Sequence, residues 1–382
     1  MYARTTIPVA LACVKRGWDV TFQVNRPVVL GRSFGFSDNT IKKSPTNVNI
    51  LNPDSYNWIA ELIGIYQDWR SIHEQVDFSW SPLTSKKKFD AIIGTQKDID
   101  ILSQIAAQGI PTFALGYQHL PIIASLNSSL TNRNHNLDRD SIFFSDNPFS
   151  AEHKFADIVK NCKVRLNSFT YLDIVYSRKP KYARQKDQVL IFCPGGYRGI
   201  ISEPGQDKIT CYKAQKALLE RICLPLLNRN ITPILKVHPL RAQYHDVEDL
   251  RILSDQIERE NNLAENSIRI MKPLSWVWET VLESIFILSF GGSGIYELWT
   301  AGVRNVYVCG FEGTSRSQKF DIFDCCVLNS YSDYENLLET STANIPNFDK
   351  LTDSVFNAYQ NLFDGNATSR VIEEICLQLG RD

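Results

Sequence analysis

Short apolar runs alternate along the chain with longer amphipathic stretches. Runs of roughly four to eight apolar residues are typical of buried strands, whereas apolar residues three and four apart indicate helices. In the first half, this pattern predicts helices over residues 5–16, 56–72, 97–107 and 151–160, and strands over residues 18–24, 89–94, 111–115 and 140–145. Strands that are separated by helices pair in parallel through right-handed crossovers.

The second half shows the same alternation more regularly. It predicts strands over residues 188–193, 232–237, 267–271, 285–289 and 305–308, with helices over residues 210–228, 247–261, 275–284 and from a glycine turn near residue 291 to Ala301. Two more helices are expected at residues 349–363 and 369–379. Strands that alternate with helices in this way predict a doubly wound parallel sheet, and therefore the α/β fold class.

The length of the chain favours two domains, because 382 residues exceed the usual size of one hydrophobic core. Residues 177–187 are polar and basic, as in a linker. We therefore expect one α/β domain at residues 1–178, a second at residues 188–330, and helices at residues 331–382 that pack across the junction. A strand normally precedes the first helix of an α/β domain, so the first strand is expected to be missing from this sequence.

Composition excludes several classes of protein. The net charge is -1 and charged residues make up 22% of the chain, which gives no basic field for nucleic acid. The nine cysteines include no C-x-x-C pair, and Cys193, Cys223 and Cys309 stand in apolar runs, as buried free thiols do. No apolar run reaches the roughly 18 residues that span a bilayer. We expect a cytoplasmic protein; peripheral contact with the inner face of a membrane, through basic clusters such as Lys86–Lys88, stays open.

The stretch from Ser289 to Glu297 carries the strongest chemical signal. It follows an apolar run, contains Gly291, Gly292 and Gly294, and leads into a helix. Glycines permit a tight turn, and the free N–H groups and dipole at the start of a helix attract anions. A phosphate site is therefore one interpretation, and a simple strand-to-helix turn is the other.

Three other loops end strands of the same predicted sheet, and in a doubly wound sheet such loops line one edge. Backbone N–H groups, serine hydroxyls and basic side chains at this edge are suited to the phosphates of a nucleotide leaving group. Glu297, one helical turn beyond Ser293, is placed to accept hydrogen bonds from ribose hydroxyls. The predicted binding residues are Gly195, Gly196, Tyr197, Arg198, Lys236, His238, Pro239, Met271, Lys272, Pro273, Ser289, Gly291, Gly292, Ser293 and Glu297.

The second half contains the run Lys236-Val237-His238-Pro239, followed by the serines at 289 and 293 and then by Glu297 with Ala301-Gly302. This pattern resembles the donor half of GT-B glycosyltransferases. The resemblance is strongest to bacterial cell-surface polysaccharide enzymes: the HP-motif sialyltransferases, the capsule and lipopolysaccharide Kdo transferases, and the CDP-glycerol glycerophosphotransferases. It implies a GT-B-like fold with two facing Rossmann-like domains, in which residues 188–330 bind the donor and residues 1–178 lie on the acceptor side. It also implies that His238, Ser289 and Ser293 hold the phosphate of a cytidine nucleotide.

The pattern departs from this family at Gly291-Gly292, where polyol-phosphate transferases more often have an Asp-Tyr-Ser-Ser type of run. Glycine-rich turns also occur in UDP-dependent relatives, so the donor base stays open, with cytidine favoured by the HP pair. The Pro194–Arg198 segment matches the glycerophosphotransferases only loosely. The resemblance covers roughly residues 188–310 and does not identify the acceptor.

Catalysis by such an enzyme needs a base that deprotonates an acceptor hydroxyl. His119 follows a predicted strand end and is the first candidate, with Asp146 and Glu203 as the others. Direct displacement inverts the anomeric centre. No Asp-x-Asp motif is visible, so neither an essential metal nor another cofactor is expected beyond the nucleotide-sugar co-substrate.

The favoured interpretation is an inverting glycosyltransferase that transfers Kdo or sialic acid from a CMP-linked donor to a capsule or lipopolysaccharide glycan or a glycolipid. A CDP-glycerol-type polyol phosphate transferase and an enzyme similar to the UDP-GlcNAc 2-epimerases are alternatives. A binding module of the same fold that lacks a catalytic base is the non-enzymatic alternative.

Overall fold

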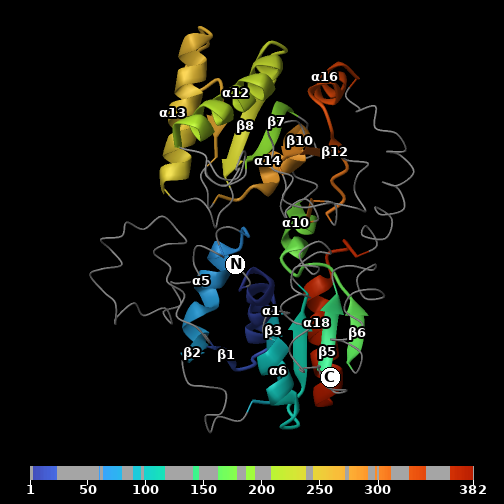
Figure 1. Ribbon diagram of the computed structural model, residues 1–382. Helices are drawn as coiled ribbons and strands as arrows, with labels where there is room; N and C mark the ends of the chain where they lie inside the picture. Colours follow the sequence, from blue (N-terminus) through green and yellow to red (C-terminus); the bar gives the residue numbers. More distant parts are fainter. Residues whose placement is uncertain are drawn as a thin grey trace.

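The computed structural model describes residues 3–23, 60, 63–79, 89–95, 99–116, 141–145, 162–178, 186–193, 208–237, 244–271, 275–290, 297–298, 301–310, 327–340 and 362–381. Within these ranges the strands form parallel sheets of two, four and six strands. The α/β fold class predicted from the sequence is therefore confirmed. Figure 1 shows the six-stranded sheet in one half of the molecule and the smaller sheets in the other.

The N-terminal half contains the two smaller sheets. In one sheet β1 pairs with β2, and in the other the strands follow their chain order, β3-β4-β5-β6. Every residue of β4 and β5 is buried, and their polar residues Thr112 and Ser141 lie opposite each other with hydroxyl oxygens 2.6 Å apart. The strands are β1 (Val20–Gln23), β2 (Val76–Ser79), β3 (Ile92–Thr95), β4 (Thr112–Leu115), β5 (Ser141–Ser145) and β6 (Lys163–Leu166).

The C-terminal half contains the six-stranded sheet, in the order β12-β11-β10-β7-β8-β9 with every pair parallel. The chain therefore starts in the centre at β7, moves outward to β9, returns beside β7 with β10, and moves outward again. This order is that of a Rossmann fold. The strands are β7 (Lys186–Cys193), β8 (Thr232–Val237), β9 (Arg269–Ile270), β10 (Ser284–Ser289), β11 (Val306–Cys309) and β12 (Val327–Leu328).

Helices connect and cover these strands. They are α1 (Ala3–Lys15), α5 (Tyr66–Ile72), the 3₁₀ turn η2 (His73–Gln75), α6 (Ile99–Ala106), α10 (Leu172–Arg178), α12 (Lys208–Leu227), α13 (Tyr244–Glu260), α14 (Trp278–Glu283), α16 (Tyr331–Thr340) and α18 (Ala367–Leu379). One face of the six-stranded sheet packs against α12, α13 and α16 through an apolar cluster that includes Ile191, Leu219, Leu253 and Tyr334.

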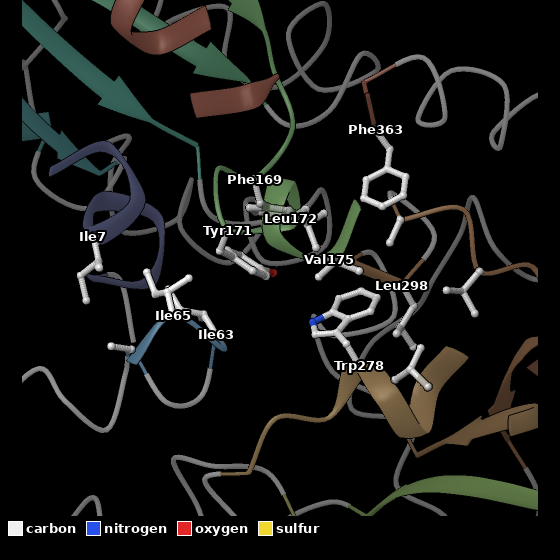
Figure 2. Close-up of a cluster of buried hydrophobic side chains, with 14 of the residues drawn as sticks. Ile7, Ile63, Ile65, Phe169, Tyr171, Leu172, Val175, Trp278, Leu298 and Phe363 are labelled. Atoms are coloured by element: carbon white, nitrogen blue, oxygen red, sulfur yellow. The ribbon is translucent and has the colours of Figure 1, made fainter. Parts of the chain in front are cut away.

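The opposite face of the six-stranded sheet belongs to an apolar cluster that both halves share, and we call it the junction cluster. It joins Ile7 of α1, Ile65 and Tyr171 to Trp278 and Leu298 of the C-terminal half. Figure 2 shows these side chains converging from the two halves, with α10 between them in Figure 1. Burial of this much apolar surface packs the halves against each other.

The helices after residue 330 divide between the two halves. Tyr334 and Leu337 of α16 pack on the six-stranded sheet. In contrast, Val371, Ile372 and Ile375 of α18 pack with α1 and with the apolar residues of β4 and β5. The domain boundaries predicted at residues 178, 188 and 330 stay predictions.

Some elements differ from those predicted. The helix expected over residues 56–72 begins its last segment only at Tyr66, because Ile63 and Gly64 form a turn in which Gly64 has a φ of 76°. A side chain at Gly64 would also meet Trp276 at 2.7 Å. The sequence pattern did not predict β2, β6 or β12; β12 has two residues, too few for any periodicity.

The cysteines singled out in apolar runs are buried and free. Cys193, Cys223 and Cys309 all lie on the α12 face of the six-stranded sheet. Burial raises the pKa of the Cys193 thiol to about 12. They are inert core residues, because a thiol reacts as the thiolate and burial disfavours that charge.

Candidate functional site

The order of the six-stranded sheet places a topological switch point between β7 and β10. One crossover leaves β7 toward β8, and the chain later returns on the other side of β7 as β10. Ligands of open α/β sheets bind beyond the carboxyl ends of the strands at such a point. Four neighbouring strands of this sheet precede the four predicted loops: β10, β7, β8 and β9. Because the strands are parallel, their carboxyl ends share one edge of the sheet.

Two of the predicted residues stand at the same level of this edge. Ser289 of β10 pairs with Phe192 of β7, and Phe192 pairs with Lys236 of β8. One strand, β7, therefore separates Ser289 from Lys236, and adjacent strands lie about 4.8 Å apart. The structure therefore brings a hydroxyl and an amine to the two sides of the central strand, next to the switch point.

Both side chains point to the face of the sheet that carries the junction cluster. Residues two apart in a strand share a face. Ile287 and Ile234, two residues before Ser289 and Lys236, belong to the junction cluster, and Phe192 packs against it. The hydroxyl and the amine therefore lie on the side of the sheet that faces the N-terminal half.

Lys236 is only 2% exposed. Burial lowers the pKa of its amine to about 7, because an ammonium group loses hydration when it leaves water. A buried amine with a shifted pKa at a strand end of a switch point is a group of the kind found at functional sites. A lone strand-end lysine gives no sign of this burial in the sequence.

Met271 lies at the same edge, directly after β9. Its backbone N–H donates to the carbonyl of Leu235 at 2.9 Å, which continues the ladder between β9 and β8. Its side chain packs against the junction cluster. Met271 therefore contributes an apolar side chain next to Lys236, on the same face of the sheet.

Glu297 is buried and is paired with a residue of the N-terminal half. Arg4 of α1 donates from Nη1 to Glu297 Oε2 at 3.0 Å and from Nη2 to Oε1. The guanidinium of Arg4 lies over the ring of Tyr171, 4.9 Å from its centre. Sequence reasoning missed Arg4, because 293 residues separate it from Glu297 and no motif surrounds it.

The other predicted site residues lie outside the described residues. They are Gly195, Gly196, Tyr197, Arg198, His238, Pro239, Lys272, Pro273, Gly291, Gly292 and Ser293 of the donor loops, and the candidate bases His119, Asp146 and Glu203. Their roles stay predictions. His119 and Asp146 follow β4 and β5, which are adjacent in the four-stranded sheet.

The carboxyl edge of the four-stranded sheet contains a small cavity. Thr5 of α1, Gly116 after β4 and Ser168 after β6 line it. Ser168 is 6% exposed, and its hydroxyl has no hydrogen-bond partner among the described residues. Leu115 and Phe144 also line it, so β4 and β5, which precede His119 and Asp146, end beside this cavity.

Two further observations concern metals and membranes. Among the described residues, no cluster of three or more His, Cys, Asp or Glu side chains is arranged to bind a metal ion. Nor does any helix in the described ranges combine the length and apolar character that a membrane span requires.

No protein-family model matches this sequence, and no curated protein matches it. Several solved structures are similar in fold. A UGT transferase from Siraitia grosvenorii in complex with UDP has a TM-score of 0.48 at 8% identity, over 99% of this chain and 96% of that chain. CalG4, the calicheamicin glycosyltransferase, has a TM-score of 0.47 at 10% identity, over 99% and 95%. The wall teichoic acid polymerase TagF has a TM-score of 0.43 at 11% identity, over 82% and 76%.

Proposed function

We propose that this chain is a GT-B-type glycosyltransferase that takes its sugar from a nucleotide-activated donor. One observation carries the proposal: a buried lysine and a buried serine flank the central strand at the switch point of a Rossmann-type sheet. Nucleotides bind at such points in open α/β sheets. Lys236 and Ser289 hold the donor phosphate, together with the predicted loop residues His238 and Ser293.

The chemistry is a single displacement. A base of the N-terminal half, with His119 as first choice, removes the proton of an acceptor hydroxyl, and the oxygen attacks the anomeric carbon. The bond from this carbon to the phosphate oxygen breaks, and its electrons remain on the nucleotide. The anomeric centre is thereby inverted, and the charge of the leaving phosphate increases.

Lys236 stabilises the charge on the leaving phosphate. Burial sets the pKa of its amine to about 7, and a phosphate beside the amine raises that pKa, so donor binding takes up a proton near neutral pH. A preorganised positive group at a site of developing charge typically lowers the barrier by about 3 kcal/mol. No metal is needed for this step if Lys236 and the loop donors carry the charge.

The HP pair at 238–239 favours a cytidine nucleotide, with CMP-Kdo or CMP-sialic acid as donor and a capsule or lipopolysaccharide glycan as acceptor. This would place the protein at the cytoplasmic face of the cell membrane. Transfer of a polyol phosphate from CDP-glycerol would use the same donor site, and a product that contains phosphorus would distinguish it. Interconversion of a UDP-sugar without any acceptor would indicate the epimerase instead.

Binding of nucleotides tests the proposal directly. We expect CMP, CDP or UDP to raise the melting temperature of the protein, because a ligand at about 100 times its Kd stabilises the fold by about 2.7 kcal/mol. Lys236→Met should remove most of this stabilisation while the protein stays folded. Affinity in the unsubstituted protein should fall as the pH rises above 7, because the amine of Lys236 then loses its proton.

Lys216→Met is the matched control. Lys216 pairs with Glu220 and Glu260 on the opposite side of the sheet, so its loss should leave nucleotide binding unchanged. The proposal fails if none of the three nucleotides shifts the melting temperature, or if both lysine variants bind as the unsubstituted protein does.

A further inference from the structure

The ion pair between Arg4 and Glu297 joins the N-terminal half to the segment that follows the glycine turn. Two hydrogen bonds connect the guanidinium to both carboxylate oxygens. The side chains are 12% and 10% exposed. Paired, fork-to-fork contact of this kind fixes the orientation of a carboxylate as well as its charge.

Arg4 is itself held firmly in place. It lies in the first turn of α1, and its guanidinium stacks on Tyr171, a side chain that is 1% exposed. Ile7, one turn further along α1, and Leu298, next to Glu297, both belong to the junction cluster. Figure 2 shows Ile7, Tyr171 and Leu298 around the same junction. The guanidinium is therefore a fixed group rather than a mobile surface charge.

A nucleotide would not displace this guanidinium. Removal of one partner from a buried ion pair leaves an uncompensated charge, which is strongly unfavourable. The neutral hydroxyls of a ribose cannot replace that charge. However, an ionised carboxylate has about four lone-pair positions, and Arg4 uses two of them. Within the part of the chain that the structure describes, no other group bonds to this carboxylate, which leaves positions for hydroxyl donors.

We propose that Arg4 is a positioning residue of the donor site: it orients the Glu297 carboxylate so that its remaining lone pairs accept hydrogen bonds from the donor ribose. This inference rests on the proposed function. It means that residues 188–330 do not contain the whole donor site, because a residue near the start of the chain orients one of its side chains.

The ratio of affinities for ribose and dideoxyribose nucleotides isolates this role. We would measure binding of CMP, CDP and UDP and of their 2′,3′-dideoxy forms by calorimetry. A hydrogen bond to a charged group is worth about tenfold or more in affinity, so the protein should bind the ribose form about tenfold tighter. Glu297→Gln should reduce this ratio strongly. Arg4→Met should reduce it to about twofold, with little change in affinity for the dideoxy form.

Arg4→Lys keeps the charge but loses the fork, so its ratio should lie between those of Arg4→Met and the unsubstituted protein. If Arg4→Met yields little folded protein, Arg4→Lys provides the test. Arg165→Met is the control, because Arg165 forms an ion pair with Glu374 and neither residue belongs to the junction cluster. Its ratio should not change.

Three results would overturn the inference. In one, Arg4→Met and Arg4→Lys retain the full ratio, and Arg4 only connects the halves. In the second, both variants lose affinity equally for ribose and dideoxyribose forms, as a general loosening of the fold would cause. In the third, the unsubstituted protein binds no nucleotide, and the proposed function fails with it; the first two leave the proposed function intact.

Discussion

One face of the six-stranded sheet is covered by helices close to its strands in the chain, whereas one face of the four-stranded sheet is covered by two helices that are distant in the chain. Helices α12, α13 and α16 alternate with the strands that they cover. In the four-stranded sheet, α6 covers one face locally, but α1 and α18 cover the other. The cover of the six-stranded sheet can be predicted from the sequence, because strands and helices alternate over short distances. The cover of the four-stranded sheet cannot, because it depends on packing between distant segments.

The two sheets also differ in what their carboxyl edges contain. The six-stranded sheet buries Lys236 and Ser289 at its switch point. The four-stranded sheet has a small cavity at its carboxyl edge, whose lining includes Thr5 and Ser168. The two described edges therefore differ in the side chains that they bury.

The largest effect is expected where the four-stranded sheet depends on α18. Ile372→Ala removes a side chain that is 1% exposed, and such a change typically costs about 2–5 kcal/mol. Leu377→Ala on the same helix removes a side chain that is 74% exposed and should cost less than about 0.5 kcal/mol. Urea midpoints of the two variants measure the difference. Equal midpoints would show that α18 contributes little to this core.

The second effect concerns pH and the six-stranded sheet. The pKa of Lys236 is about 7 in the folded protein and 10.5 in its ordinary state. Between these values the unfolded chain binds the extra proton, so the free energy of unfolding rises with pH, by at most about 1.4 kcal/mol per pH unit. Below pH 7 the folded protein also binds this proton, so the dependence on pH levels off there.

Urea unfolding of the protein and of Lys236→Met between pH 6.5 and about 9 measures this slope. The variant should be the more stable of the two near pH 7, and the difference should shrink as the pH rises. A constant difference across this range would mean that Lys236 does not titrate there.

The smallest effect concerns the start of α18. Asp173 of α10 accepts hydrogen bonds from the backbone N–H groups of Ala367 and Thr368, at 2.9 and 2.7 Å. It thereby satisfies two of the free N–H groups that begin a helix. Asp173→Asn should cost about 1 kcal/mol of stability, as the loss of a helix cap does. Asp255→Asn, at an exposed position of α13, should have no effect in the same urea measurement.

Sequence reasoning predicted the six-stranded sheet well for a physical reason. Most of its strands contain short apolar runs, and β8 has the predicted bounds, residues 232–237. The same reasoning also predicted that Lys236, Met271 and Ser289 lie at the carboxyl edge of this sheet, because the carboxyl ends of parallel strands meet there. It did not detect β12, whose two residues are too few for a pattern.

Contacts between distant segments had no signal in the sequence. The pairing of Arg4 with Glu297 and the capping of α18 by Asp173 each join residues nearly 200 or more positions apart. Single charged residues on amphipathic helices are usually solvated, so nothing in the pattern distinguishes these. The turn at Gly64 interrupts a helix that the apolar spacing predicts, because spacing does not report a positive φ.

The packing of α18 against the four-stranded sheet has a consequence for the order of events during synthesis. Ribosomes deliver the N-terminal half first, but Val371, Ile372 and Ile375 complete its core only after nearly the whole chain has emerged. The six-stranded sheet does not depend on a later segment in this way, because α12, α13 and α16 are synthesised close to its strands. We therefore expect the second half of the chain to reach its compact form first, with the nascent first half leaving apolar surface open to chaperones until then.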